Sequence, residues 1–315
     1  MAEKRQASLR SLFRTRNREL AREIASLERA TELPSTILIL GESGTGKDRL
    51  ARAIHDVSAR APRPFVRVDA ANLSDELFES ELFGHERGAF TGAISAKKGL
   101  LEVAEDGTVY LDEVSSLSPA AQAKFLRVLQ ERNFRRLAGV TTHPFRARLI
   151  VSSRRDLAVL VEQGAFRDDF FYRIDVVSVR LPRLSDRRED LLPLAREFAK
   201  RAARAYDRPA RRFTREAEQT LLRHPWPGNV RELLNVVEKA VLTAESPEIG
   251  PGDLPSGALG APESLLAAAV EGRWTLRALT DAYIDETLRR AGGNRTLAAK
   301  RLGVSRKFLW EREKK

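Results

Sequence analysis

Hydrophobic patterning divides the first 180 residues into a leader and an alternating region. Residues 8–32 carry apolar side chains at helical spacing among many charges, which predicts one amphipathic leader helix. Beyond Pro34, short β-rich runs alternate with helical stretches; the runs are Thr36–Leu40, Phe65–Val68, Thr108–Leu111, Ala147–Val151 and Val176–Val179. This alternation predicts an α/β fold, with a parallel sheet covered by helices on both faces.

The second half of the chain is predicted to be helical. Residues 187–244 show helical periodicity throughout, which predicts a separate helical lid. Residues 246–264 contain four prolines and four glycines with little periodicity, a composition typical of a linker. The predicted organisation is therefore a leader at 1–33, an α/β core at 34–182, a lid at 183–245, a linker at 246–264 and a small helical module at 265–315.

Composition narrows the possible chemistry. The chain has no cysteine, and its four histidines show no metal-ligand spacing, so disulfides, thiol nucleophiles and cysteine-based metal sites are excluded. No apolar run is long enough to cross a bilayer, and the charged N-terminus does not look like a signal peptide, which predicts a cytoplasmic protein without a membrane partner. The formal net charge of +11 suits a polyanionic partner, but an arginine-rich solvated surface explains it equally well.

A glycine-rich loop follows the first predicted strand and precedes a helical run. Its residues are Gly41, Glu42, Ser43, Gly44, Thr45, Gly46 and Lys47. In this context the loop directs backbone N–H groups and a helix N-terminus at phosphates, and Lys47 reaches the terminal phosphates. The next residue is Asp48, where the general phosphate-loop pattern has a serine or threonine that holds magnesium. These residues predict a nucleotide site for ATP.

An apolar strand ends in two acids about 65 residues after the glycine-rich loop. In an α/β sheet this edge presents ligand-binding residues. Beside a phosphate loop, Asp112 is predicted to orient Mg²⁺ and Glu113 to activate the attacking water. The two motifs together predict ATP hydrolysis with Mg²⁺ as the metal, whereas a strand ending in Asp-Glu alone is usually just a solvated strand end.

Residues 81–93 read Glu-Leu-Phe-Gly-His-Glu-Arg-Gly-Ala-Phe-Thr-Gly-Ala. Gly88 and Gly92 permit a tight, mobile turn, and Phe90 is predicted to be an exposed apolar tip that inserts into a partner. The alternative is an ordinary glycine turn with Phe90 in the core. With this stretch, the chain resembles the sigma-54-dependent activators of the AAA+ ATPase superfamily over nearly its whole length.

The resemblance implies roles for further residues. The loop that faces the ring pore and contacts sigma-54 is made of Gly88, Ala89, Phe90, Thr91, Gly92 and Ala93. Arg167 and Arg173, within residues 166–174, match the segment that supplies arginines to the neighbouring subunit's γ-phosphate. Arg231, within Trp-Pro-Gly-Asn-Val-Arg-Glu-Leu, matches the sensor that reports the nucleotide state to the lid.

The chain departs from the family pattern near the nucleotide. The family's first sensor usually reads Thr-Asn, but Ser153 and Arg154 stand here, so the hydroxyl is retained and a fixed charge replaces the amide. Asp69 stands where many relatives have an asparagine that holds the catalytic glutamate away from water. Two acids repel unless they are bridged, so coupling between Glu113 and the pore loop is expected to differ.

Residues 291–310 predict a helix-turn-helix similar to the Fis-type domain that closes many of these activators. Ala298 and Ala299 allow close helix crossing, Gly303 permits the turn, and Ser305 caps a second helix whose apolar side carries Phe308 and Leu309. Residues 294–315 hold eight Lys/Arg and two Glu, a net charge of +6. The predicted DNA contacts are Arg306, Lys307 and Arg312 in the groove or on phosphates, Asn294, Arg295 and Thr296 on the backbone, and also Ser305. A hairpin that serves only dimerisation is the alternative.

The predicted architecture is an AAA+ P-loop parallel-sheet core with an all-α lid and a small all-α helix-turn-helix domain. The resemblance implies an activator that binds upstream enhancer DNA and, as a dimer assembling into a hexamer ring, uses ATP to remodel the closed complex of sigma-54 RNA polymerase into an open complex. A regulator that merely occupies DNA, and a different AAA+ machine such as a helicase loader, are the rival interpretations. The residues before position 30 leave no room for a sizeable regulatory domain, so we expect control by a separate regulatory protein or by abundance if the natural protein begins at Met1.

Overall fold

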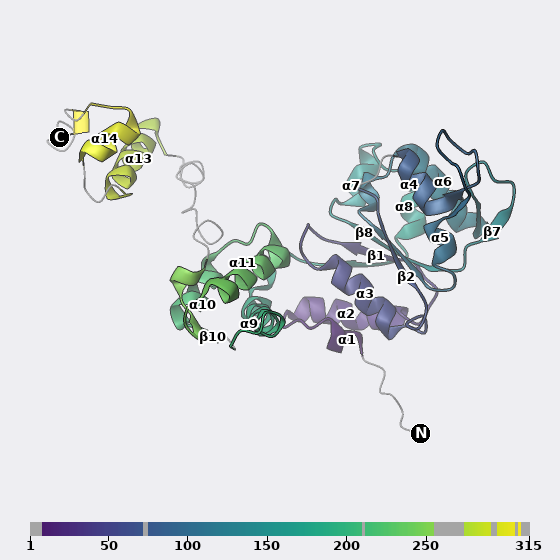
Figure 1. Ribbon diagram of the computed structural model, residues 1–315, viewed down its shortest axis with the longest axis horizontal. Coiled ribbons are helices and arrows are strands. Elements are labelled where there is room, and N and C mark those ends of the chain that lie inside the picture. The colour runs from purple at the N-terminus through teal and green to yellow at the C-terminus, as the bar shows by residue number, and fades with distance from the viewer. Residues whose placement is uncertain are drawn as a thin grey trace, which may run out of the picture. The chain divides into compact units, whose positions relative to one another are not determined.

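The computed structural model describes residues 8–71, 75–209, 212–254, 274–290, 295–305 and 308–309. The chain forms two compact units, Met1–Asp253 and Leu254–Lys315 (Figure 1). The first holds the sheet and the lid, and the second holds the C-terminal helices. None of the helices in the described ranges is long and apolar enough to cross a membrane.

Five parallel strands form the central sheet, in the order β2-β5-β8-β1-β9. They are β1 (Ile37–Leu40), β2 (Phe65–Asp69), β5 (Thr108–Asp112), β8 (Arg148–Ser153) and β9 (Val177–Arg180). Each coincides with a run predicted from the sequence, so the parallel α/β core is confirmed. Because the strands are parallel and in register, Asp69 lies beside Asp112, and Leu40 beside Ser153, at one edge of the sheet.

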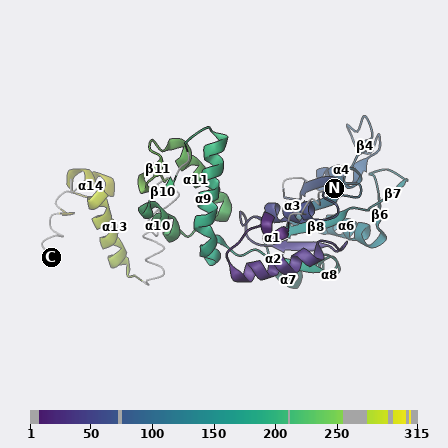
Figure 2. The ribbon, with the colours of Figure 1, turned by 90° about the horizontal axis from the view of Figure 1, so that it is seen from below.

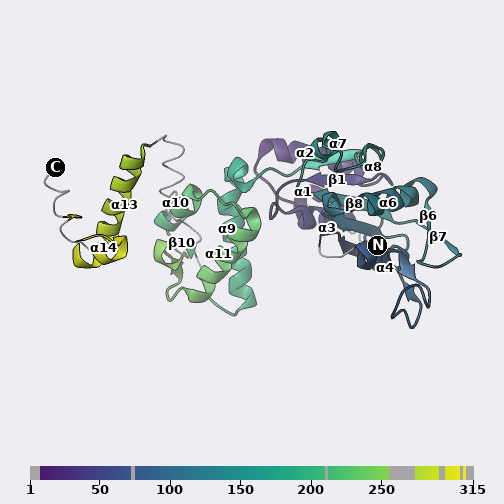
Figure 3. The same ribbon diagram turned by 90° about the horizontal axis from the view of Figure 1, so that it is seen from above.

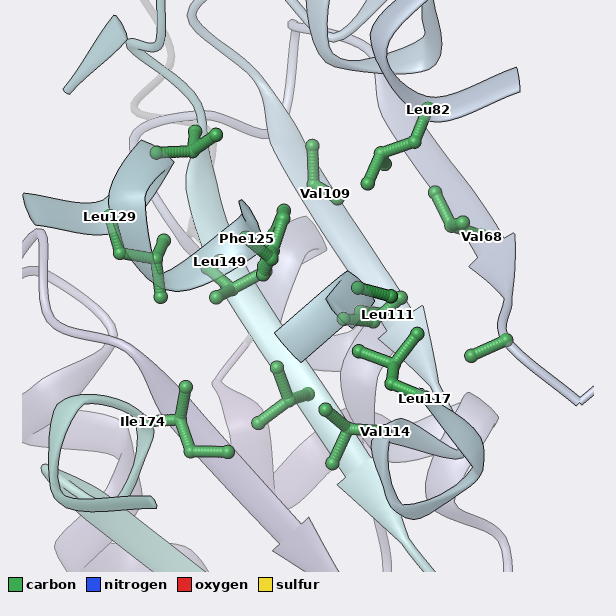
Figure 4. Close-up of a cluster of buried hydrophobic side chains, with 14 of the residues drawn as sticks. Val68, Leu82, Val109, Leu111, Val114, Leu117, Phe125, Leu129, Leu149 and Ile174 are labelled. Atoms are coloured by element: carbon green, nitrogen blue, oxygen red, sulfur yellow. The ribbon is translucent and has the colours of Figure 1, made fainter. Parts of the chain in front are cut away.

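Helices cover both faces of this sheet, as the alternating pattern predicted (Figure 3). One face packs against α1 (Leu9–Leu12), α2 (Arg18–Ala30) and α3 (Lys47–Val57). The other packs against α4 (Asp75–Phe83), α5 (Leu100–Val103), η1 (Val114–Ser116), α6 (Pro119–Glu131), α7 (Leu157–Glu162) and α8 (Asp168–Ile174). On this second face Val109, Leu111 and Leu149 point toward Phe125 and Leu129 of α6 (Figure 4).

The leader is two helices instead of the single predicted helix over residues 8–32. The chain leaves helical geometry after α1 because residues 15–17 make other hydrogen bonds: Thr15 Oγ1 donates to Asp190 Oδ2 at 2.6 Å, and the Arg16 N–H also donates to Asp190. Asn17 then begins α2, since its side chain accepts a hydrogen bond from the Leu20 N–H at 2.9 Å. The interruption fastens the leader to the first helix of the lid.

Two short hairpins extend the α/β core. One pairs β3 (Gly84–His85) with β4 (Lys97–Lys98), and the other pairs β6 (Asn133–Arg135) with β7 (Thr142–Pro144). The loop between β3 and β4 projects from the body of the core (Figure 2). It contains the residues predicted to face a partner.

The lid follows β9 and is mainly helical. Its elements are η2 (Leu184–Arg187), α9 (Arg188–Ala205), β10 (Arg212–Phe213), α10 (Arg215–Arg223), α11 (Asn229–Thr243), β11 (Glu248–Ile249) and η3 (Pro251–Asp253). β11 pairs with β10, and both Ile249 and Leu254 are buried. Residues 246–253, predicted as linker, are therefore part of the folded lid, because Ile249 interrupts the glycine and proline pattern and is buried where β11 pairs with β10. After Leu254 the predicted linker lies outside the described residues.

The second unit contains α13 (Leu276–Arg290) and α14 (Arg295–Leu302), followed by helical residues 308 and 309. Ala298, Ala299 and Leu309 are buried together with Ile284. Gly303 has a φ of 67°, which a residue with a side chain adopts only at a cost. Ser305 caps the next helix, because its Oγ accepts the Phe308 N–H at 3.1 Å. The predicted helix-turn-helix packing is confirmed, although Phe308 is half-exposed and lies outside this cluster.

Candidate functional site: a phosphate loop under a helical lid

The glycine-rich loop lies between β1 and α3, in the context that phosphate binding requires. Gly44 and Gly46 have positive φ values of 78° and 106°, and Gly46 begins α3. Lys47 is buried and its Nζ donates to the carbonyl oxygens of Gly41 at 2.7 Å and Glu42 at 3.1 Å. Burial lowers the pKa of Lys47, while Glu113 and Asp112 act in the opposite direction. Lys47, Asp112 and Glu113 line the same pocket, which is the arrangement expected of a phosphate-binding lysine.

The lid lies directly on the phosphate loop. The N–H groups of Val230 and Arg231 donate to the Gly44 carbonyl, and Arg231 Nη1 donates to Ser43 Oγ at 2.9 Å. A Cβ on Gly44 would lie 2.3 Å from the Gly228 carbonyl oxygen, so only glycine fits beneath the start of α11. Arg231 thus joins the lid to the phosphate loop, which is the position expected of a residue that reports nucleotide state.

The two acids at the end of β5 have different surroundings. Glu113 has a φ of 60° and its Oε1 accepts hydrogen bonds from Ser115 Oγ at 2.6 Å and the Arg154 N–H at 3.1 Å. A non-glycine residue in this conformation is costly and is held by its neighbours. The Arg154 Nε is 3.7 Å from the same oxygen, so the residue that replaces the family's amide lies beside the predicted water-activating carboxylate.

The Asp112 carboxylate has more hydrogen-bond and ion-pair partners than that of Glu113. Its Oδ1 accepts hydrogen bonds from Ser152 Oγ at 2.5 Å and Tyr110 Oη at 3.0 Å, and its Oδ2 lies 2.5 Å from Arg67 Nη2. Burial opposes ionisation of Asp112, but these hydrogen bonds outweigh it and lower the pKa of Asp112 below its ordinary value. Asp112 is therefore ionised at neutral pH, as a magnesium ligand must be.

The remaining sensor residues lie at the same edge of the sheet. Asp69 lines the pocket together with Lys47, Asp112 and Glu113, and its Oδ1 accepts the Ala71 N–H at 3.0 Å. Ser153 is fully buried, and its Oγ donates to the Arg155 carbonyl oxygen at 2.6 Å. The serine hydroxyl that donates a hydrogen bond to Asp112 is thus that of Ser152, one residue before the predicted sensor Ser153. The sensor roles of Asp69 and Ser153 stay predictions.

Three side chains of the site were missed by sequence analysis: Arg67, Tyr110 and Ser152. A signal was present for the first two. Tyr110 precedes Asp112 by two residues on one strand and so shares its face, and Arg67 is a charge inside an apolar strand that ends in Asp69. Ser152 could not be chosen over Ser153, because the choice depends on which of the two serines lies on the same face of the sheet as Tyr110 and Asp112.

The donor set suits Mg²⁺ with a nucleotide. No group of three or more His, Asp or Glu residues suited to a metal ion occurs in the part of the chain that the structure describes. Mg²⁺ usually binds through one or two carboxylates together with substrate phosphates, and Asp112 and Asp48 are both at hand. Asp48 replaces the usual hydroxyl with a carboxylate, which is also an oxygen ligand.

Within the loop of residues 88–93, Gly88 and residues 90–92 are exposed, whereas Ala93 is buried. Phe90 is 47% exposed, and its ring meets the edge of His85 with centroids 4.9 Å apart. The Gly88 N–H donates to the Ala93 carbonyl at 2.9 Å, which closes the turn. Ile94, which sequence analysis did not select, is 85% exposed. The prediction that Phe90 belongs to an exposed tip is confirmed, and the alternative of a core position for Phe90 is wrong.

The two arginines predicted to act in trans lie at α8, and neither lines the pocket of its own chain as the described residues define it. Arg167 precedes α8 and pairs with Asp169 at 2.7 Å, and Arg173 Nη2 donates to the Leu129 carbonyl at 2.9 Å.

Among the predicted DNA contacts, Thr296 and Ser305 are exposed, and Arg295 begins α14. Asn294, Arg306, Lys307 and Arg312 lie outside the described residues.

A five-stranded parallel sheet with a phosphate loop, an acidic strand end and a helical lid defines the AAA+ class of P-loop proteins. Comparison with protein families agrees: the sigma-54 interaction domain matches residues 13–180, the AAA+ ATPase lid domain matches 185–268, and the bacterial regulatory protein of the Fis family matches 275–315. The chain therefore belongs to the family of sigma-54-dependent transcriptional regulators with a Fis-type helix-turn-helix.

Proteins similar to this chain include a transcriptional regulatory protein and a nitrogen fixation protein. The chain is 44% identical over 278 residues to the transcriptional regulatory protein ZraR of Klebsiella oxytoca, covering 87% of this chain and 62% of that protein. It is 40% identical over 291 residues to the nitrogen fixation protein AnfA of Azotobacter vinelandii, covering 92% and 54%. The crystal structure of NtrX from Brucella abortus in complex with ADP aligns with a TM-score of 0.72 at 33% identity, covering 94% of this chain and 67% of NtrX. NtrX has also been crystallised with ATP.

Proposed function

We propose that this protein is a transcription activator that binds DNA upstream of its promoters and hydrolyses ATP in a ring oligomer. The energy is used to remodel the closed complex of sigma-54 RNA polymerase into an open complex. Membership of the sigma-54 interaction family supports this proposal, as does the presence of a nucleotide pocket and an exposed apolar loop on one α/β body.

The path of the chain from the pocket to the loop is the observation that carries the proposal. β2 ends at Asp69 in the pocket, α4 follows after residues 72–74, which lie outside the described residues, and α4 runs directly into β3 and the loop. Ser80 of α4 contacts His85 Nδ1 at 3.0 Å, and the His85 ring packs on Phe90. A shift of α4 would therefore move Phe90 at the tip of the loop. This movement would couple the nucleotide state to the contact between the loop and a partner protein.

Hydrolysis would use the residues already in place. Lys47 and the N–H groups at the start of α3 would bind the phosphates, and Asp112 would hold Mg²⁺, which would supply positive charge beside them. Glu113 takes a proton from the attacking water, and Arg154 and Ser115 keep its carboxylate in position. Arg231 connects this site to the lid, so loss of the γ-phosphate changes how α11 lies on the loop.

Assembly would complete the site. The Arg167 side chain is 45% exposed and, within the described part of the chain, pairs with Asp169 two residues further on, so it could be released to reach another subunit. An arginine supplied in trans stabilises charge in the transition state, which makes hydrolysis depend on oligomerisation. We therefore propose that dimers bind enhancer DNA through the helix-turn-helix and assemble into a hexamer.

Thr91→Ala tests the coupling. The variant should hydrolyse ATP normally but lose promoter opening, because Thr91 is exposed in the loop and does not line the pocket. The measurement is ATP-dependent open-complex formation by sigma-54 polymerase, with ATPase activity recorded in parallel. Thr243→Ala, an exposed threonine at the end of α11, should open promoters normally. Normal opening by the Thr91 variant would remove the loop from the mechanism, and no opening by the unaltered protein would favour a regulator that only occupies DNA, or another AAA+ machine.

Replacing Arg306 and Lys307 together with alanine should weaken DNA binding and spare hydrolysis. Each phosphate contact that is lost should reduce the slope of log affinity against log salt by about 0.9. Binding to enhancer DNA is measured by fluorescence anisotropy at several salt concentrations. Arg223→Ala, an exposed arginine at the end of α10, serves as the control. Unchanged affinity in the double variant would indicate that the C-terminal helices serve dimerisation alone.

A further inference from the structure

Arg67 bridges the two carboxylates on the magnesium side of the pocket. It lies on β2, and its Nη1 is 3.0 Å from Asp48 Oδ2 while its Nη2 is 2.5 Å from Asp112 Oδ2. Asp48 belongs to the first turn of α3 and Asp112 ends β5, so one guanidinium joins three elements of the core. Each terminal nitrogen of Arg67 thus forms an ion pair with one of the two carboxylates.

Hydroxyl groups occupy the other carboxylate oxygens. Tyr110 Oη lies 2.9 Å from Asp48 Oδ1, 3.0 Å from Asp112 Oδ1 and 3.1 Å from Ser152 Oγ, so both acids are within reach of its single proton. Ser152 Oγ donates to Asp112 Oδ1 as well. The Oδ1 atoms thus face buried hydroxyls, whereas the Oδ2 atoms face the guanidinium in the pocket. Oδ2 is the oxygen of Asp112 that a metal in the pocket would approach.

The guanidinium therefore supplies positive charge to Asp48 Oδ2 and Asp112 Oδ2, as a bound metal cation would. Two carboxylates and one guanidinium leave a net charge of −1, and removal of the guanidinium would leave −2 facing the phosphates. The Arg67 side chain is 47% exposed, so the pair is screened by solvent and can be exchanged. A divalent cation competes well for such oxygens, because Mg²⁺ prefers carboxylate and phosphate ligands.

We propose that Arg67 is a built-in cation that occupies Asp112 Oδ2 until Mg²⁺-nucleotide displaces it, and that it thereby sets the magnesium requirement of the site. This inference rests on the proposed binding of ATP with Mg²⁺. After displacement the guanidinium keeps its contact with Asp48. Arg67 is thus a positioning residue, because it acts on the nucleotide through Asp112.

The experiment follows binding of a fluorescent ADP analogue to the full chain while Mg²⁺ is varied. In Arg67→Ala the magnesium concentration for half-maximal binding should fall about tenfold, since a charge-assisted hydrogen bond no longer competes for Asp112. In EDTA the same variant should bind the analogue more weakly than the unaltered protein, because two uncompensated carboxylates face the phosphates. A purely structural role would weaken binding equally with and without Mg²⁺.

A second measurement needs no nucleotide. Millimolar Mg²⁺ should raise the melting temperature of nucleotide-free Arg67→Ala, where the two acids lack their cation, and should leave that of the unaltered protein unchanged. Arg127→Ala is the matched control, because Arg127 forms an exposed ion pair with Glu131 and does not line the nucleotide pocket. It should show the magnesium response of the unaltered protein.

The outcomes separate the two proposals. An unchanged magnesium requirement in Arg67→Ala, with the analogue still bound, would overturn the inference about Arg67. Failure of the unaltered protein to bind the analogue at any magnesium concentration would overturn the proposed nucleotide function instead. If the alanine variant does not fold, Arg67→Lys decides: a point charge cannot bridge both acids as the planar fork does, so its magnesium requirement should also fall, and an unchanged value would count against the inference.

Discussion

Glu113→Gln should lower the ATPase rate by about 100-fold or more, because a general base contributes roughly that much to a hydrolysis rate. The amide oxygen of glutamine can still accept the hydrogen bonds from Ser115 and the Arg154 N–H, so the local backbone should be preserved. The side chain no longer takes a proton from water. Nucleotide affinity should stay within a few-fold of normal, since Lys47 and the phosphate loop are unaltered.

Two measurements check this result: steady-state phosphate release, and binding of a fluorescent ATP analogue. Glu245→Gln is the control, because Glu245 is exposed after α11 and does not line the pocket. It should hydrolyse ATP at the normal rate. Undiminished hydrolysis by the Glu113 variant would refute the water-activating role and would direct attention to Asp69, the other acid of the pocket whose role is open.

Arg148→Met should lower the free energy of unfolding by about 3 kcal/mol, because buried groups that lose their hydrogen-bond partner cost about 1–3 kcal/mol each. Arg148 is 2% exposed, and its guanidinium donates to the carbonyl oxygens of Ala30 at 2.8 Å, Thr31 at 2.7 Å and Ser35 at 3.2 Å. Burial, with a smaller contribution from nearby Arg60, lowers the pKa of Arg148 to about 10, which leaves it charged at neutral pH. Methionine keeps the apolar stem but leaves three carbonyls without this donor.

Urea unfolding followed by circular dichroism measures the loss. Arg146→Met is the matched control, since Arg146 is exposed two residues earlier in the chain, and its effect should stay within about 0.5 kcal/mol. Amide hydrogen exchange at residues 28–37 should also accelerate in the Arg148 variant, because the end of α2 is no longer tied to β8. Equal losses in the two variants would show that the three carbonyls find other partners.

The core of the fold could be predicted from local pattern alone. Each strand of the sheet is a short β-rich run between helical stretches, and a strand in a parallel sheet is buried on both faces, so its composition reveals it. The phosphate loop could also be recognised from the sequence, because its glycines, Lys47 and the flanking strand and helix are contiguous in the chain. The exposed loop and the turn at Gly303 were found for the same reason.

The leader and the predicted linker show where local pattern fails. Apolar spacing alone could not show that the leader would break after α1, since the break depends on Asp190, a residue 175 positions away from Thr15. Residues 246–254 looked like linker because glycine and proline dominate there, yet Ile249 is fully buried when β11 pairs with β10. In both cases a distant partner, absent from the local window, determines the structure.

The sequence by itself determined the α/β class, the phosphate loop, the acids Asp112 and Glu113, and the exposed position of Phe90. Each of these features depends on residues that are close together in the chain. Only the tertiary structure decided how the acids are bound. Asp48, Arg67 and Asp112 lie on three separate elements, and their contact arises because parallel strands in register end at one edge of the sheet. The choice of Ser152 over Ser153 has the same cause: the alternation of a strand assigns each side chain to a face, but only the neighbouring strand shows which face adjoins the site.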